Sequence, residues 1–517
     1  MMRSLFSGVS GLKSHQTRMD VIGNNISNIN TVGFKSSRTT FADMLSQTSK
    51  GAAKPSSTLG GTNPMQIGLG TAVASIDLIT NDGSPQSTGK NTDVALSGNG
   101  MFVLKRGDAY YYSRDGAFEF DNDGNYVLPG SGLYVQGWNA VDGSLNTNSD
   151  PTNIVVPAGR AMPATATSQV DFNGNLNASA LTIESMTITA ASGGDSSTVV
   201  TTSGTSVTSV NVDGDNVISA RLTMSDGSTM TVTSGYYEVG HSVPVTTIVT
   251  VYDSEGKTHA VTMLMDKSPG ATAADSETTV GDTTVSNDNR WRIYLAPEEG
   301  TKGPADSAYT GRLTTSEADG STTEIGFSGT NVTDSSTMAY SYIYFNDDGS
   351  LSTINASGAL QLTYTDGNGA ATTTSSVGFD GLTQYSGNST AYPTADGNKF
   401  GVLQSISIDT SGVLTGTYTN GVLRFEAQIA VAQFVNPAGL TKTGTSLYQQ
   451  SNNSGVANIK TVTDLGLSIT PSALEMSNVD LASELADMIV TQRGFQSNSK
   501  VITVGDEMLE TLVNMKR

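Results

Sequence analysis

The 517-residue sequence contains no cysteine and only three histidines. Without cysteine there can be no disulfide, no thiolate metal site and no cysteine nucleophile. His15, His241 and His259 are far apart, and no two have the spacing that places metal ligands on one helix face. There is no Gly-x-Ser-x-Gly elbow and no phosphate-binding glycine loop with lysine. The 48 acidic residues could include a catalytic pair of carboxylates, as in a glycosidase, but no sequence pattern singles out such a pair. We therefore expect no metal, no cofactor and no enzymatic activity.

Charge and long apolar runs are also scarce. Only 15% of the residues are charged, and the formal net charge is −21. We expect no nucleic-acid partner, because an acidic surface repels phosphate. We also expect no membrane span, because no apolar run approaches the roughly 20 residues that a membrane helix needs. Residues 1–20 alternate apolar and polar residues with helical period and lack the continuous apolar core of a secretory signal. If the protein leaves the cell, we expect export without a cleaved signal peptide.

Both ends of the chain carry apolar residues at intervals of seven. Such a repeat drifts slowly around a helix and favours a partner helix that wraps against it. We therefore expect helices over about 3–28 and 477–514 that lie side by side and serve for polymerisation. The predicted seam consists of Leu5, Leu12, Met19, Ile26, Leu474, Leu481, Met488, Phe495, Ile502 and Leu509.

The start of the C-terminal helix is marked by Ser477 as the cap, with Asp480 at the reciprocal position of a capping box. The companion positions Gln492, Ser499 and Asp506 are polar, so the apolar seam is thin. Ordering so much backbone costs more than a thin seam returns. We expect both ends to be disordered in the free monomer and to fold when neighbouring copies add apolar surface.

The middle of the chain is rich in Gly, Ser, Thr and Asn, which is typical of turn-rich β structure. Period-two runs begin near residue 71, and Asp121-Asn122-Asp123-Gly124 is a strong hairpin signal. Similar turns recur at 346–349 and 410–412. The predicted fold is multidomain α+β, with a coiled-coil-like pair of N- and C-terminal helices and two or three all-β domains nested between them. The predicted parts are a helical domain (1–30 and 474–517), a connector (31–70 and 455–473), an inner β domain (71–145 and 385–454) and an outer β region of two domains (146–384).

Several segments resemble the axial proteins of the bacterial flagellum, the rod and hook subunits. Residues 24–35 (NNISNINTVGFK), 477–485 (SNVDLASEL) and 488–496 (MIVTQRGFQ) carry the resemblance at the two ends. Residues 96–104 and 113–118 are similar to an inner β domain that rod and hook share. The interior segments 249–259 and 430–440 are similar to hook proteins in particular.

The resemblance implies a homopolymer that forms the tubular hook, a flexible universal joint between rod and filament outside the cell. It implies rod proteins, hook–filament junction proteins and a hook cap as partners, and export through the flagellar type III export gate. Phe41 and Leu45 resemble the hydrophobic motif by which early export substrates dock on that gate, although an ordinary amphipathic turn has the same pattern.

Two other functions fit parts of the sequence. A distal-rod subunit of the basal body accounts for the two ends but not for the long β-rich insertion. A secreted β-rich adhesin accounts for the middle but not for matched heptads at both ends.

Overall fold

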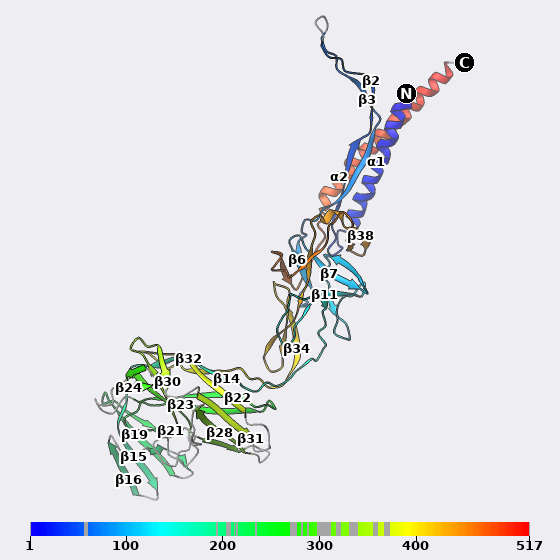
Figure 1. The fold of residues 1–517 in the computed structure, drawn as a ribbon. Helices are drawn as coiled ribbons and strands as arrows, with labels where there is room; N and C mark the ends of the chain where they lie inside the picture. Colours follow the sequence, from blue (N-terminus) through cyan, green and yellow to red (C-terminus); the bar gives the residue numbers. More distant parts are fainter. Residues whose placement is uncertain are drawn as a thin grey trace. The chain divides into compact units, whose positions relative to one another are not determined.

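The computed structural model divides into two compact units, Met1–Arg160 with Val402–Arg517 (unit 1) and Ala161–Gly401 (unit 2). The predicted fold class is confirmed, since two terminal helices pack together and β-rich domains lie between them in sequence (Figure 1). Among the described residues, no helix is both long and apolar enough to cross a membrane. The structure describes residues 2–55, 60–192, 195–202, 208–210, 212–213, 216–232, 235–268, 277–280, 283–286, 289–296, 312–316, 322–329, 340–354, 360–366 and 373–515.

The two helices of unit 1 are α1 (Met2–Ser27) and α2 (Leu481–Asn514), and they run antiparallel, so both chain ends lie at the same end of the pair (Figure 1). The predicted cap was wrong. Asp480 caps α2 by accepting a hydrogen bond from Ala482 N at 3.0 Å, whereas the Ser477 hydroxyl accepts one from Val479 N in the preceding loop. The Ser477–Asp480 pattern fits a capping box, but Asp480 itself is extended (φ −93°, ψ 108°) and the helix begins only at Leu481.

The connector predicted over 31–70 is largely β structure. β1 (Ser37–Asp43) pairs with β4 (Thr71–Leu78), and β2 (Ser46–Lys50) pairs with β3 (Met65–Gly68). Both ladders are antiparallel and form one long arm (Figure 1). Gly, Ser and Pro residues dominate the composition of this segment and so predict a connector, yet they lie mainly between β2 and β3.

The main sheet of unit 1 buries aromatic residues on one face. Phe102 and Phe118 meet edge to face, with ring centroids 5.2 Å apart, and both are fully buried. The predicted hairpin is confirmed, because β9 (Glu119–Phe120) pairs with β10 (Tyr126–Leu128) across the Asp121–Gly124 turn. The sheet order is β34 (Gly401–Ile408), β35 (Val413–Tyr418), β36 (Leu423–Ile429), β11 (Leu133–Asn139), β7 (Met101–Arg106), β8 (Ala109–Ser113), β39 (Leu447–Gln449) and β38 (Thr441–Gly444).

The chain returns to unit 1 through two short strands just before α2. β41 (Ser468–Pro471) pairs with β6 (Val94–Ser97), and β42 (Ala473–Glu475) pairs with β5 (Pro85–Ser87). The last strands of the chain therefore complete sheets that the N-terminal part begins.

Unit 2 contains two sheets that share one core, and Trp291, Phe172 and Phe379 are fully buried in it. A third sheet has its own small core around Met186 and Leu222. The first sheet has the order β22 (Val245–Tyr252), β23 (Thr258–Lys267), β26 (Arg290–Leu295), β29 (Ser341–Phe345) and β30 (Leu351–Ile354). The second has the order β27 (Arg312–Ser316), β28 (Thr322–Gly329), β31 (Leu360–Asp366), β32 (Thr373–Tyr385), β14 (Gln169–Asn177) and β33 (Tyr392–Ala395). The third has the order β16 (Asp195–Thr202), β15 (Ile183–Ser192), β19 (Asn216–Met224) and β18 (Val212–Asp213), and β20 (Thr229–Val232) also pairs with β19.

The units divide at 160/161 and 401/402 rather than at the predicted 145/146 and 384/385. Ile154 and Val156 belong to the core of unit 1. β33 pairs with β14 and so belongs to unit 2. Turn signals located the ends of strands, but they do not say which sheet a strand joins.

Candidate assembly site: the terminal helix pair and its base

The two helices approach closely because glycines lie between them. A Cβ atom on Gly11 would lie 2.8 Å from Asn498 Nδ2, and one on Gly494 would lie 2.7 Å from His15 Cε1. A Cβ atom on Gly505 would lie 2.7 Å from Leu5 Cδ2. Side chains that face these glycines therefore contact the opposite backbone directly, which brings the helices near with little apolar area buried.

The helix pair uses only part of the predicted seam. Leu474 lies in β42, outside the helix, and Leu481 and Phe495 are exposed on α2. The seam residues that are half-buried are Leu5, Leu12, Met19 and Ile26 on α1 and Met488, Ile502 and Leu509 on α2.

The companion row of α2 was misplaced by one position. Gln492, Ser499 and Asp506 are exposed, whereas the row that is at least half-buried consists of Glu484, Thr491, Asn498 and Gly505. These four also recur every seven residues, but an apolar count misses them because none is apolar. They share the seven-residue interval of the predicted apolar seam, and that shared interval is the signal that would have identified them.

Polar contacts fix the end of the pair that is nearest the β structure. The buried Asn25 side chain donates from Nδ2 to Glu484 Oε1 at 2.8 Å and to Ser37 O at 2.9 Å. Its Oδ1 accepts from Ser37 N at 3.0 Å. One turn further along, Arg18 and Asp487 form an ion pair at 3.1 Å. Burial raises the pKa of Glu484, although its hydrogen bond from Asn25 opposes that shift. Asn25 thus joins α1, α2 and β1.

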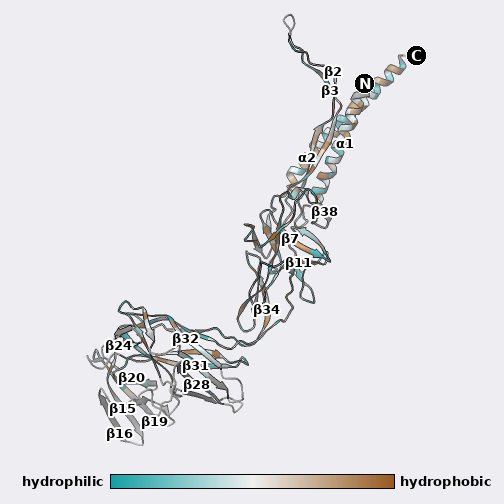
Figure 2. Cartoon of the chain, in the orientation of Figure 1, coloured by the Kyte–Doolittle hydropathy of each residue, from teal (hydrophilic) through white to brown (hydrophobic). Residues whose placement is uncertain are grey.

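A row of exposed apolar side chains runs along α2, and we call it the apolar face of α2. Spacings of three, four and eleven residues, each close to a whole number of helical turns, place its members on one side of the helix. Hydrophobic residues recur along the whole of α2 (Figure 2). The apolar face consists of Val490 (62% exposed), Val501 (45%), Val504 (40%), Met508 (44%) and Leu512 (45%). From residue 496 onward the opposite face is polar, whereas nearer the start of α2 the same side exposes Leu485 and Ile489. The residues of the polar face are Gln496, Ser499, Lys500, Thr503, Glu507 and Glu510, all exposed.

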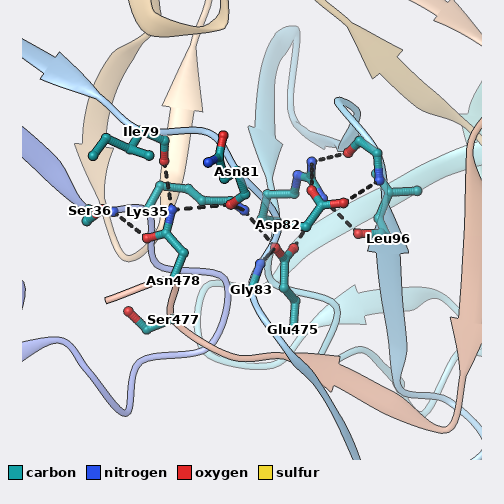
Figure 3. A network of polar contacts seen from close by, with 12 residues as sticks. Lys35, Ser36, Ile79, Asn81, Asp82, Gly83, Leu96, Glu475, Ser477 and Asn478 are labelled. Carbon is teal, nitrogen blue, oxygen red and sulfur yellow. Dashed lines mark hydrogen bonds and ion pairs between the residues drawn. The ribbon is translucent and has the colours of Figure 1, made fainter. Parts of the chain in front are cut away.

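Below the helices, four charged groups meet in a cluster that we call the terminal clasp: Lys35, Asp82, Arg114 and Glu475. The side chains of Lys35, Arg114 and Glu475 are buried, whereas that of Asp82 is 36% exposed. Lys35, Asp82 and Glu475 are labelled in Figure 3. Glu475 Oε1 accepts from Lys35 Nζ at 2.6 Å and from Gly83 N at 2.8 Å. Glu475 Oε2 accepts from Arg114 Nη1 at 3.2 Å. Glu475 is therefore the buried carboxylate between two buried cations, and Asp82 adds a negative charge to Arg114 from the surface.

The clasp is closed by further hydrogen bonds. Arg114 Nη2 donates to Asp82 Oδ1 at 3.1 Å and also to Gly98 O. Lys35 Nζ donates to Asn81 O at 2.6 Å. Burial lowers the pKa of Lys35, and Glu475 opposes that shift. Lys35 lies within a segment already compared with flagellar proteins, but its pairing with Glu475 could not be read from the sequence because 440 residues separate them.

Asn478 ties the two chain ends together beside the clasp. Its Oδ1 accepts from Ser36 N at 2.8 Å, and its Nδ2 donates to Ile79 O at 2.9 Å (Figure 3). Gly33 N donates to Glu475 O at 2.8 Å. Gly33 has a positive φ of 65°, and a Cβ there would lie 2.6 Å from Asp115 N, so only glycine fits this turn.

The two residues of the predicted export motif are not brought together. Phe41 packs against α1, with its ring centroid 5.7 Å from that of His15 and 5.9 Å from Arg18 Cζ. Leu45 is 86% exposed. Within the part of the chain that the structure describes, no cluster of three or more His, Asp or Glu residues could hold a metal ion.

Four family models match successive parts of the chain. They are described as flagella basal body rod protein (residues 5–35), flagellar hook protein FlgE/F/G D1 domain (95–185), flagellar basal body protein FlaE D2 domain (241–398) and flagellar basal body rod FlgEFG protein C-terminal (470–515). The third sheet of unit 2 lies almost entirely between the second and third of these matches.

Relatives that match over the full length are named flagellar hook protein FlgE. The Treponema pallidum protein is 35% identical, with 100% of each chain covered. The Borreliella burgdorferi protein is 34% identical, also with 100% of each covered, and the Escherichia coli protein is 30% identical with 98% of each covered. A Bacillus subtilis rod protein, FlgG, is 53% identical, but the match covers only 22% of this chain and 44% of that one. The predicted family is thus confirmed, and the chain belongs to the flagellar hook proteins, the structural subunits of the bacterial flagellar hook.

Proposed function

We propose that the apolar face of α2 is the main contact through which copies of this subunit polymerise into the hook. The observation that carries the proposal is its exposure after α1 and α2 have paired. Soluble proteins rarely leave such a row of apolar side chains uncovered. Full burial of one large apolar side chain contributes about 1.5–3 kcal/mol, so covering several of them would strongly favour association.

The test is a double substitution on the apolar face with a matched control on the polar face. Val504→Asp/Met508→Asp places two carboxylates one turn apart where we expect a neighbouring copy. Ser499→Asp/Thr503→Asp adds the same charges at the same spacing on the opposite side of the same helix. We expect the first variant to lose assembly in sedimentation and electron microscopy and the control to keep it. Normal polymers from the first variant would contradict the proposal.

We also propose that the β domains outside the helical tube slide on one another and let the hook bend as a universal joint. Polar contacts between domains are weaker and wetter than apolar ones, so they can change while the helical contacts stay closed. The third sheet of unit 2 can be excised between Thr182 and Ser242, which are β-bridge partners. The excision also removes Glu238 and His241 from the Arg292–Asp266 cluster, so native fluorescence of Trp291 is checked first. Replacing 183–241 by two glycines should leave assembly intact and alter hook curvature or stiffness; loss of assembly would refute this division of labour.

The remaining partners follow from the same proposal. The subunit would leave the cell through the flagellar type III export gate without a cleaved signal peptide. It would then join rod proteins, the hook cap and hook–filament junction proteins. Phe41 would be readable at the gate only before it packs against His15. Phe41→Ala/Leu45→Ala should therefore reduce secretion in cells, whereas the purified variant should still polymerise.

A further inference from the structure

Glu475 is the centre of the terminal clasp, and its side chain is only 2% exposed. It faces two buried cations, Lys35 and Arg114, which lie 440 and 361 residues earlier in the chain. Removing one partner of such a cluster leaves an uncompensated buried charge, which costs far more than losing an exposed ion pair. The three residues come from the start, the β structure and the end of the chain, so the clasp joins all three.

The clasp lies close to both helices along the chain. Lys35 follows the last residue of α1, Ser27, by eight positions, and Glu475 precedes the first residue of α2, Leu481, by six. Short tethers give two segments a high effective concentration for each other. The contacts above the clasp then follow in order: Ser36 with Asn478, Asn25 with Glu484, and Arg18 with Asp487.

From this arrangement we propose that Glu475 is the positioning residue for assembly. By neutralising Lys35 and Arg114 it holds the two chain ends together at the base, and α1 and α2 pair in one register from that point upward. The consequence for polymerisation rests on the proposed role of the helices, although Glu475 itself is too deeply buried to contact another copy.

The variant Glu475→Gln tests this, because it keeps the shape of the side chain and removes its charge. Glu119→Gln is the matched control, since Glu119 belongs to the same unit and pairs with Lys90 at the surface. The readout uses the cysteine-free background: Arg18→Cys/Asp487→Cys adds one thiol to each helix, and a short bis-maleimide reagent joins the thiols when the helices lie in register. Dilute, unassembled chain is used, so polymer contacts play no part. Rapid crosslinking of the chain with Glu475 intact would also show that the helices pair in the free monomer, against the disorder expected from the thin seam.

We expect Glu475→Gln to slow this intramolecular crosslinking at least tenfold, and Glu119→Gln to leave it unchanged. The fluorescence of Trp138, in the β structure of unit 1, should stay native in both. Lys35→Met is the second variant, because Arg114 then still faces Glu475 and the β structure keeps a paired cluster. It should slow crosslinking as well.

Unchanged crosslinking in Glu475→Gln or in Lys35→Met would overturn the proposal. Loss of the native Trp138 fluorescence in both Glu475→Gln and Lys35→Met would also overturn it, because the clasp would then stabilise the β structure of unit 1 in general. The proposed polymer contact is judged separately by the Val504→Asp/Met508→Asp variant, whose assembly can fail or persist without changing the crosslinking result.

Discussion

The two units bury charge in different ways. In unit 2, Asp266 holds Arg292 through two hydrogen bonds, at 3.1 and 2.7 Å, from strands β23 and β26, which are neighbours in the sheet and only 26 residues apart. Glu238 adds a third contact to Arg292 at 2.7 Å. In unit 1, the clasp instead joins Lys35 to Glu475 across nearly the whole chain.

This difference separates a unit that is complete in itself from one that depends on both chain ends. Unit 2 closes its core with residues from its own sheets. Unit 1 needs the last strands and α2 to complete its structure, and it still leaves the apolar face of α2 exposed. A self-contained unit such as unit 2 suits independent movement. A unit completed by its termini, such as unit 1, suits polymerisation, because its final surface forms only when both ends are in place.

The largest expected effect would come from breaking the charge cluster of unit 2. Burial alone would raise the pKa of Asp266, but Arg292 and His241 hold it below its usual value. Asp266→Asn removes the main partner of a buried guanidinium, which typically costs about 3–5 kcal/mol. We expect the unfolding transition of unit 2 to shift by that amount and that of unit 1 to stay where it is.

The two tryptophans allow this measurement, since Trp138 lies in unit 1 and Trp291 in unit 2. Trp138→Phe and Trp291→Phe each leave one fluorescent reporter for denaturant unfolding. Asp380→Asn, at an exposed position on β32, is the control and should shift neither transition. Equal shifts of both reporters in Asp266→Asn would show that the units unfold together and would end the comparison.

A smaller effect should distinguish glycines within α1 itself. Gly11 faces Asn498, whereas no atom lies within 4 Å of a Cβ built on Gly23. Gly23→Ala should stabilise the helix by about 1 kcal/mol, because alanine is the better helix former. Gly11→Ala gains the same propensity but overpacks the contact with α2, which costs about 1–3 kcal/mol.

Thermal dissociation of assembled hooks, followed by circular dichroism at 222 nm, measures the difference. Gly11→Ala should dissociate at a lower temperature than the wild type, and Gly23→Ala should not. If both variants behaved alike, the close approach at Gly11 would not be part of the assembled pair.

The sequence was sufficient for the fold class because its strongest patterns are local. The seven-residue repeats predicted both helices, and Asp121–Gly124 predicted a hairpin, since each signal lies within a few turns or residues. The period-two run that begins near residue 71 predicted β4 (Thr71–Leu78). The strands β1 to β3 were missed because their polar, glycine-flanked sequences resemble a connector.

The candidate site was predicted only in part, because its decisive contacts are non-local or polar. Thr491 and Gly505 line the helix pair without being apolar, and therefore escaped a hydrophobic count. The clasp depends on Lys35 meeting Glu475, and no spacing along the chain encodes that contact. The role of the predicted seam in polymerisation stays a prediction. The apolar face of α2 is the surface on which polymerisation can be tested.

The smallest expected effect concerns pH and again contrasts the two units. Burial lowers the pKa of His15, and Arg18 lowers it further. Its ring faces Gly494 of α2 and Phe41 of β1, and Arg18 is paired with Asp487. Separated helices would bind more protons than paired ones between the lowered pKa and the ordinary value of about 6.5, so pairing weakens as pH falls through that range. We expect hooks to dissociate more readily at pH 5.5 than at pH 7.5 by light scattering, with a smaller difference in His15→Gln. His241→Gln, in unit 2, should keep the wild-type difference. Loss of the difference in His241→Gln would instead place the acid-labile contact in unit 2 rather than in the helix pair.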